Sequence, residues 1–289
     1  FQVTPGDRWD FTATQQIILA DLPIAGKTRK VLMQAPKNGF FYVIDRTNGE
    51  FISGNNFVQV NWASGLDPKT GRPILTEQAD YSTAPKVVQP SFLGGHSWHP
   101  MSFNPTTGYV YIPAQDTLAE LKAADKPLFL PTKSVVNFGL DVPDLPEDPK
   151  VFNQIRSAWR GHLIAWDPVK QQAAWTHDYV ESGNGGTLST AGNLVFEGSA
   201  DGRVIAYAAD TGDKLWEQPA ASGVMAAPVT YSVDGEQYVT FMAGWGGAFS
   251  TFAGALSLRA GVQPYAQVLT YKIGGTAELQ EPAPRNDAP

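Results

Sequence analysis

A short strand–turn–strand motif recurs along this 289-residue chain and limits its fold more than any other feature of the sequence. The clearest copy is Ala206–Trp216, in which an apolar run is followed by Asp210-Thr211-Gly212 and then by a second run that ends in Trp. Glycine suits such a turn because it adopts positive φ angles without a steric penalty. The motif therefore predicts a pair of antiparallel strands.

Three further copies suggest that the motif is a structural repeat. Ala165–Trp175 has the same ten-residue offset from Ala to Trp, whereas Val43–Gly49 and Ser102–Gly108 repeat the strand and turn without the Trp. The equivalent positions are 45, 104, 167 and 208, so the spacings are 59, 63 and 41 residues. A period of ~40–45 residues with inserted loops is typical of β-propeller blades. Coincidental turns in a β-sandwich are the alternative.

Short apolar runs rich in β-branched and aromatic residues support an all-β fold class. They are bounded by Gly, Pro, Asn or Asp, and two of the separators, Ala200-Asp201-Gly202 and Val233-Asp234-Gly235, carry the Gly that tight hairpins need. The runs expected to form strands are Lys30–Met33, Phe40–Ile44, Tyr109–Pro113, His162–Trp166, Asn193–Glu197, Arg203–Ala208 and Gln237–Ala243.

Two segments depart from the repeat. Residues 115–160 contain an expected short helix at Thr117–Ala124 and a Pro- and Asp-rich stretch at Asp141–Pro149, so we interpret them as an insertion over one face of the blades. Residues 276–289 are rich in Pro and charge, as interdomain linkers are. We therefore expect one β domain over 1–275 and a linker over 276–289.

Composition excludes several classes of function. The formal net charge is −7, so the chain lacks the basic surface of a nucleic-acid-binding protein. It has no Cys, and so it carries no disulfide, thiol nucleophile, Cys-ligated zinc or CxxCH haem attachment. No apolar run reaches the ~18 residues of a membrane span. The start at Phe1 has neither an initiator Met nor a signal-peptide pattern, as if the sequence began inside a longer chain.

Common catalytic and metal-binding motifs are missing from the sequence. It contains no HExxH, GxSxG or GxGxxG, and Gly26-Lys27-Thr28 is no phosphate-binding loop because Asp21 stands where that motif needs Gly. His96 and His99 are spaced i, i+3 and could share a metal ion. Because no third ligand is evident, a polar loop pair is the favoured interpretation.

One constellation can carry chemistry, the hexapeptide Pro5-Gly6-Asp7-Arg8-Trp9-Asp10. Aspartates beside Gly usually form turns, and the residues alone favour that interpretation. The alternative is that one carboxylate lies beside a bound cation, stays ionised and takes a proton from a substrate hydroxyl. Lys37 is a second candidate, with a solvated turn lysine as its alternative.

Several motifs, in the same order, resemble those of the quinoprotein alcohol dehydrogenases. The closest resemblance is to the quinohaemoprotein group, which carries pyrroloquinoline quinone (PQQ) and a C-terminal cytochrome c domain. It covers nearly the whole chain and rests on the Trp-ended repeat, Pro5–Asp10, Ala35–Phe40, Asn184–Leu188 and Gly244–Gly247. It implies an eight-bladed β-propeller with PQQ and calcium on its axis, of which this chain is about the C-terminal half.

The resemblance implies roles for two of the candidate residues. Asp10 matches the catalytic aspartate of the family, which is both the general base and a neighbour of the calcium ion. Lys37 matches the cation that hydrogen-bonds the oxygens of the quinone, where its charge would stabilise the reduced quinol. Calcium would polarise the quinone carbonyl that accepts the hydride.

Four further residues match cofactor-binding positions. Asn184 corresponds to a residue near the carboxylates of PQQ. Ala248 corresponds to a position whose backbone amide binds the cofactor, beside glycines that permit a close approach. Ser97 and Trp98 match a pair that contacts the quinone, but Ser97 stands where Asn or Asp is expected. The Ser side chain is shorter than that of Asn or Asp and offers a single hydroxyl, which predicts a weaker or water-mediated contact with the quinone.

The insertion at 115–160 falls where the family varies most. We expect it to shape the access of substrate to the site. Phe129, Phe138 and Trp159 are candidate wall residues, with surface or interface packing as the equally open alternative for each.

The implied activity is the oxidation of primary or secondary alcohols to carbonyls, in the periplasm. Electrons would pass to the haem of a cytochrome c domain or of a small redox protein. The family's other calcium ligands, its adjacent-cysteine disulfide and its haem domain are not in this sequence, so we expect these 289 residues alone to be inactive. A non-catalytic β-propeller scaffold for outer-membrane protein assembly is the alternative, and it would lack the pair formed by Trp9-Asp10 and Lys37.

Overall fold

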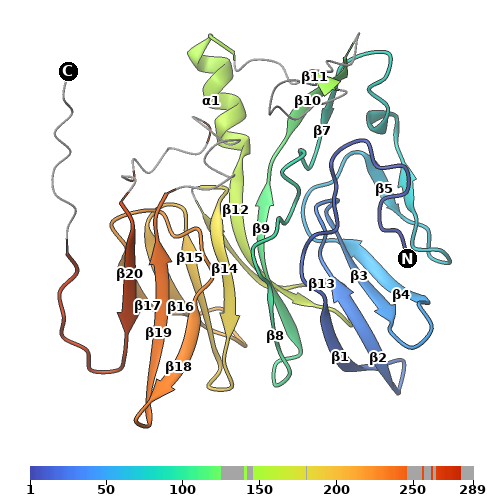
Figure 1. The fold of residues 1–289 in the computed structure, drawn as a ribbon. Coiled ribbons are helices and arrows are strands. Elements are labelled where there is room, and N and C mark those ends of the chain that lie inside the picture. Colours follow the sequence, from blue (N-terminus) through green and yellow to red (C-terminus); the bar gives the residue numbers. More distant parts are fainter. Residues whose placement is uncertain are drawn as a thin grey trace, which may run out of the picture. The chain divides into compact units, whose positions relative to one another are not determined.

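The computed structural model describes residues 1–124, 140–141, 146–179, 181–245, 256, 262 and 265–280, with the backbone alone at 140–141. The chain divides into two compact units (Figure 1). Unit 1 comprises Phe1–Trp98, Ala114–Trp159 and Pro168–Gln172, and unit 2 comprises His99–Pro113, Arg160–Asp167 and Ala173–Pro289.

Unit 1 begins with a four-stranded antiparallel meander. Its strands pair in chain order and are β1 (Ile18–Ile24), β2 (Lys27–Gln34), β3 (Phe40–Asp45) and β4 (Phe51–Asn56). Ala25 and Gly26 both have positive φ, at 51° and 75°, and so form the tight turn that matches the twist of a hairpin. All six residues of β3 are buried, which explains its continuous apolar sequence Phe-Phe-Tyr-Val-Ile.

Shorter elements complete unit 1. A hairpin joins β5 (Ala63–Leu66) to β6 (Pro73–Leu75), and the 3₁₀ helix η1 spans Glu77–Ala79. A three-stranded sheet follows, in the order β11 (Leu140–Asp141), β10 (Ala119–Ala123) and β7 (Lys86–Val88).

The expected helix at Thr117–Ala124 is wrong, because Ala119–Ala123 is strand β10. The segment has the composition of a helix, but a helix of that length is marginal without tertiary support. As a strand, it pairs with β7 from Ala119↔Val88 to Leu121↔Lys86 and buries Leu121 completely. Tertiary packing thus overrides propensity here. Residues 125–139 and 142–145 of the expected insertion lie outside the described residues.

Three antiparallel sheets make up the described part of unit 2, apart from the ends of β9 and β13 that belong to unit 1. The first has the order β13 (Gln172–Tyr179), β12 (Arg160–Asp167), β9 (Tyr109–Asp116), β8 (Ser102–Asn104). The second contains β14 (Asn184–Ser189), β15 (Leu194–Ser199), β16 (Arg203–Ala208) and β17 (Lys214–Pro219), and the third β18 (Val229–Val233), β19 (Glu236–Ala243) and β20 (Gln267–Tyr271).

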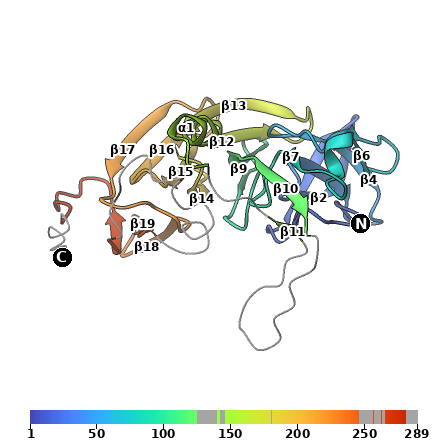
Figure 2. The same cartoon turned by 90° about the horizontal axis from the view of Figure 1, so that it is seen from above.

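Two apolar clusters hold these sheets face to face. One joins Tyr111 and Leu163 of the first sheet to Ile205 of the second. The other joins Phe196 of the second sheet to Phe241 of the third. The β14–β17 sheet therefore lies between its neighbours, as the view along the strand ends shows (Figure 2). Each of the seven runs expected to be strands overlaps a strand of the structure, and most lie entirely within one.

The repeated turn has the same geometry in its copies. The N–H of Gly49 donates to Asp45 O, that of Gly108 to Asn104 O and that of Gly212 to Ala208 O, each at 2.8 Å. At the Asp167 copy, Gln171 takes the positive φ, at 55°. A fifth copy, which was not predicted from the sequence, lies at Asp67–Gly71, where the N–H of Gly71 donates to Asp67 O, also at 2.8 Å.

An aromatic ring of one sheet packs on the turn glycine of the next sheet. Trp175 of β13 covers Gly212, and its Nε1 donates to Ala209 O at 3.2 Å. A Cβ at Gly212 would lie 2.7 Å from the Trp175 ring, so only glycine fits. In unit 1, Phe51 covers Gly71 in the same way. Blade-to-blade packing is thus the reason why the repeat ends in an aromatic residue.

Helix α1 (Pro149–Ala158) was not predicted, although the sequence carries signals for its start. The Asp148 side chain caps it by accepting from Lys150 N at 2.8 Å, and Pro149 occupies the first turn, where it needs no N–H partner. Among the described residues, no helix is both long and apolar enough to cross a bilayer. Residues 276–280 form no regular element, and the linker expected at 276–289 stays a prediction.

Candidate active site

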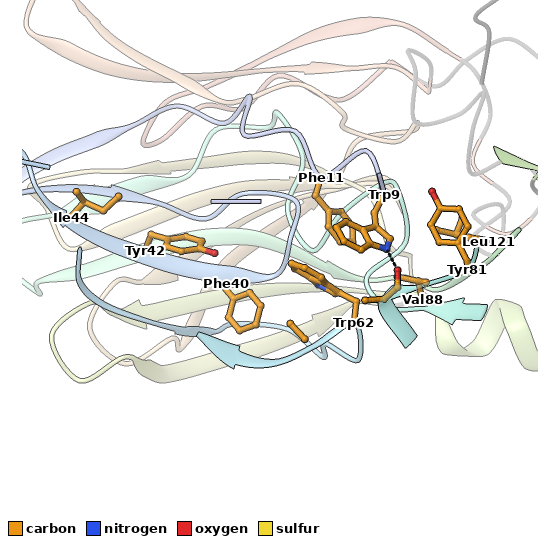
Figure 3. Close-up of a cluster of buried hydrophobic side chains, with 11 residues drawn as sticks. Trp9, Phe11, Phe40, Tyr42, Ile44, Trp62, Tyr81, Val88 and Leu121 are labelled. Carbon is orange, nitrogen blue, oxygen red and sulfur yellow. Dashed lines mark hydrogen bonds between the residues drawn. The ribbon is translucent and has the colours of Figure 1, made fainter. Parts of the chain in front are cut away.

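The site in unit 1 is built on two aromatic anchors, Trp9 and Phe11. They are only 3% and 1% exposed, and their rings stack with centroids 5.8 Å apart (Figure 3). Trp9 also packs on Trp62 with centroids 4.9 Å apart, and its Nε1 donates to Ala79 O at 3.1 Å. The side chains on both sides of Asp10 are therefore anchored in the core.

Asp10 lies between these anchors and its side chain points outward, 51% exposed. Its φ of 61° is in the left-handed region, which costs a non-glycine residue about 1–2 kcal/mol. One oxygen of Asp7, Oδ1, accepts from the N–H of Trp9 at 3.0 Å and from that of Phe11 at 3.2 Å. Asp7 is thus the turn-former of the hexapeptide, and Asp10 is the outward carboxylate.

Lys37 comes from the loop between β2 and β3. The side chain of Asn38 shapes that loop, because its Oδ1 accepts from Phe40 N at 3.1 Å and its Nδ2 donates to Tyr42 Oη at 3.0 Å. The aliphatic stem of Lys37 packs on Gly94, where a Cβ would lie 2.4 Å from Lys37 Cγ. The Lys37 side chain is therefore only 14% exposed and is directed by its surroundings.

The structure brings Lys37 and Asp10 together across 27 positions of sequence. Lys37 Nζ donates to Asp10 Oδ2 at 3.0 Å and to Asp10 O at 3.1 Å. An ammonium has three donors, so within the described residues one is left for a bound acceptor. The contact presents a cation and a half-exposed carboxylate side by side, which suits both proton abstraction and the binding of an electron-rich ligand.

Ser97 and Trp98 follow a segment that is tied to the Lys37 loop. Gly95 N donates to Lys37 O at 2.9 Å, and the ring of buried His96 bonds Ala35 O through Nδ1 at 2.7 Å. Ser97 is half-buried, whereas the indole of Trp98 is 57% exposed. A large exposed indole offers a planar surface for an aromatic ligand.

The chemistry of these residues suits PQQ, and one of their groups could serve as a calcium ligand. The third donor of Lys37 and the face of Trp98 suit an aromatic quinone, and carboxylate oxygen, as in Asp10, is a ligand that calcium prefers. Within the described part of the chain, no three His, Cys, Asp or Glu side chains gather as a metal site. The interpretation of His96 and His99 as a polar pair stays a prediction.

Asn184 lies in unit 2, at the start of β14. It is 3% exposed, and its Oδ1 accepts from Gly186 N at 3.3 Å. The strand register shifts between Asn184 and Thr187, and a Cβ at Gly185 would lie 2.5 Å from Ala226 O, so the close packing requires glycine there. Ala248, with Gly246 and Gly247, lies outside the described residues.

A buried polar network in unit 2 was not among the predicted sites. Glu197 of β15 is fully buried, and it accepts a hydrogen bond from Tyr179 Oη, which lies 3.1 Å from Tyr207 Oη. Burial raises the pKa of Glu197 to about 8, against a smaller lowering by the Tyr179 hydrogen bond. The signal in the sequence was a charged residue inside the apolar run Leu194-Val195-Phe196-Glu197.

The candidate wall residues of the substrate path are only partly described. Trp159 is 4% exposed and its Nε1 donates to Leu118 O at 3.1 Å, so it packs inside unit 1. Phe129 and Phe138 lie outside the described residues.

A family model described as "PQQ: Glucose/ethanol/alcohol dehydrogenase, beta-propeller domain" matches residues 1–64 and 153–239. The chain is 68% identical to the quinohemoprotein alcohol dehydrogenase ADH-IIG of Pseudomonas putida, with 100% of this chain and 41% of that protein covered. It is 50% identical to a quinohemoprotein alcohol dehydrogenase of Comamonas testosteroni, with 97% and 39% covered. The solved structure of ADHIIG from Pseudomonas putida HK5 superposes with a TM-score of 0.96, at 68% identity, over 100% of this chain and 43% of that one. The chain thus spans about two fifths of the length of these relatives.

Proposed function

Because this chain belongs to the PQQ-type family of glucose/ethanol/alcohol dehydrogenase β-propeller domains, we propose that the full-length protein oxidises primary or secondary alcohols to carbonyl compounds. The observation that carries the proposal is the contact of Lys37 Nζ with Asp10 Oδ2 at 3.0 Å. It places a base and a cation at one exposed point of a rigid core.

Asp10 acts as the general base of this reaction. Its exposed carboxylate can accept the hydroxyl proton of an alcohol that binds within hydrogen-bond reach. Bound PQQ would supply the acceptor for the hydride of the alcohol carbon, and calcium would supply the Lewis acid that polarises the accepting carbonyl. The buried anchors Trp9 and Phe11 keep the base from moving away from Lys37.

The remaining residues bind the cofactor. Lys37 donates its free N–H to an oxygen of PQQ, and Trp98 offers its exposed indole to the ring system. Ser97 supplies a hydroxyl, which makes a weaker or water-mediated contact. Asn184 lies near the carboxylates of the cofactor, and the backbone amide of Ala248 binds the cofactor. Both roles are proposed because the two residues match those positions of the family. Asp10 is the one calcium ligand proposed from this chain.

The names of the relatives support a proposal for the electron acceptor, and the resemblance to the family supports one for the compartment. Their name, quinohemoprotein, indicates a haem beside the quinone, so we propose that electrons leave through a cytochrome c haem, in a domain of the full-length protein or in a small redox protein. Such an enzyme would work in the periplasm.

Cofactor titration tests the proposal against a non-catalytic scaffold. The full-length protein is titrated with PQQ and calcium and followed by absorbance, and alcohol-dependent reduction of a redox dye is then measured. The proposal predicts a stable quinone chromophore and dye reduction that requires both PQQ and a primary alcohol. A protein that binds no PQQ and reduces no dye would be a scaffold, and the proposal would be wrong.

A further inference from the structure

Asp7 has a geometry that goes beyond ordinary turn formation. Its Oδ1 accepts from two backbone amides, those of Trp9 at 3.0 Å and Phe11 at 3.2 Å. These are the residues immediately before and after Asp10. A single carboxylate oxygen therefore bridges the backbone on both sides of the proposed base.

The bridge holds Asp10 in an unfavourable conformation. Its φ of 61° lies in a region that L residues avoid, so surrounding contacts must enforce it. The rings of Trp9 and Phe11 fix the two flanks in the core, but a ring anchors a side chain and leaves the peptide planes between them free to rotate. Bonding both amide hydrogens to one acceptor removes that freedom.

The conformation matters because two atoms of Asp10 meet the same ammonium. Lys37 Nζ bonds Asp10 Oδ2 at 3.0 Å and Asp10 O at 3.1 Å, so the carbonyl and the side chain must face the same way. A turned peptide plane would break at least one of these bonds and displace the carboxylate. Misplacement of a reacting group by ~1 Å can lower a rate about a hundredfold.

We propose that Asp7 is a positioning residue that holds the Asp10 carboxylate in place by accepting the amide hydrogens on both of its sides. This inference rests on the proposed function of Asp10. Asp7 is itself exposed, so its replacement removes the bridge without opening the core.

The test compares Asp7→Ala with Asp7→Asn in the full-length, PQQ- and calcium-loaded protein. Asn keeps the Oδ1 acceptor, whereas Ala removes it. Asp67→Ala is the matched control, because Asp67 Oδ1 also accepts from two amides, those of Lys69 and Thr70, in a turn away from Asp10. Hydrogen exchange of the peptide that contains Trp9–Phe11 is measured by mass spectrometry, together with kcat and KM for the alcohol.

We expect Asp7→Ala to accelerate exchange in this peptide and to lower kcat about ten- to hundredfold, with KM changed less than about threefold. Asp7→Asn should keep both the exchange rate and kcat close to the wild-type values. Asp67→Ala should change neither the exchange rate nor kcat. Unchanged exchange and kcat in Asp7→Ala would overturn the inference, and so would equal losses in the Ala and Asn variants. Exchange is read without turnover, so an inactive wild-type protein would refute the proposed function and leave the test of the Asp7 bridge valid.

Discussion

Glu197 is a carboxyl group in unit 2 whose pKa is set by its burial and by its neighbours. Tyr179 Oη donates to its Oε2, Tyr207 Oη lies 3.1 Å from Tyr179 Oη, and Asp201 and Arg203 add opposing charges. Burial is the largest effect and raises its pKa to about 8. Between the ordinary pKa of 4.5 and about 8, the folded protein therefore holds a neutral acid where the unfolded chain is ionised.

This difference predicts a pH dependence of stability. Between the unfolded pKa of 4.5 and the folded pKa of about 8, the folded state binds the extra proton, so stability falls as pH rises through that window and levels off above it. Glu197→Gln should remove this contribution. The decrease in Tm of the full-length protein from pH 5 to pH 9 is expected to be smaller in the variant by several degrees, as judged from ~2–4 °C per kcal/mol for larger domains.

Glu236→Gln is the control for this prediction. Lys272 lowers the pKa of Glu236, so this exposed carboxylate stays ionised across the whole range. Its replacement should leave the slope of Tm against pH as in the wild type. Equal slopes for wild type and Glu197→Gln would show that Glu197 does not titrate as its burial predicts.

Asp7 and Asp10 show what the sequence can and cannot predict about single residues. Both lie in one short polar segment, and local rules assign a turn to each. What separates them is the burial of Trp9 and Phe11, which depends on Trp62 and Ala79 far along the chain. The resemblance to a family identified Asp10, but only the three-dimensional contacts assign a role to Asp7.

At the scale of elements, the repeat owes its form to the packing of Trp175 on Gly212. Gly212 has a φ of 80°, and a Cβ there would lie 2.7 Å from the ring. Gly235 has an almost identical φ of 82° and no atom within 4 Å of its Cβ position. A substitution at Gly235 therefore costs only the free energy of a left-handed backbone. A substitution at Gly212 costs that free energy and also the free energy of a clash with Trp175.

Replacing each glycine by Ala should measure the two costs. Gly235→Ala should destabilise the protein by about 1–2 kcal/mol through its left-handed backbone. Gly212→Ala should cost about 1–3 kcal/mol more, because the methyl group displaces Trp175. Thermal or denaturant unfolding of the full-length protein gives both values. Equal losses would mean that Trp175 can move aside freely, contrary to its role as the contact between blades.

Strands were predictable in this chain, whereas the irregular elements were not. A run such as Phe40–Ile44 is apolar throughout and is bounded by turns, so local pattern and tertiary burial agree. In Thr117–Ala124 the local pattern favours a helix, whereas tertiary packing favours a strand. The segment forms a strand that pairs with β7. The turn at Asp67–Gly71 went unnoticed because its strands, β5 and β6, are only four and three residues long.

At the scale of the whole molecule, we propose that the chain supplies only part of a catalytic centre. Asp10 and Lys37 lie in unit 1, and the chain covers 41% of the length of ADH-IIG. Calcium takes about six to eight oxygen ligands, far more than the single carboxylate proposed here. Tests of activity therefore require the full-length protein.

The most direct test of the central claim is the rate of alcohol oxidation by full-length Asp10→Asn protein loaded with PQQ and calcium. Quinone absorbance confirms that the variant holds as much PQQ as the wild type, and Asp21→Asn, at an exposed aspartate paired with Arg46, serves as the control. Loss of the general base should lower kcat about a hundred- to ten-thousandfold, while Asp21→Asn keeps the wild-type rate. A fully loaded Asp10→Asn protein that oxidises alcohol at the wild-type rate would contradict the account.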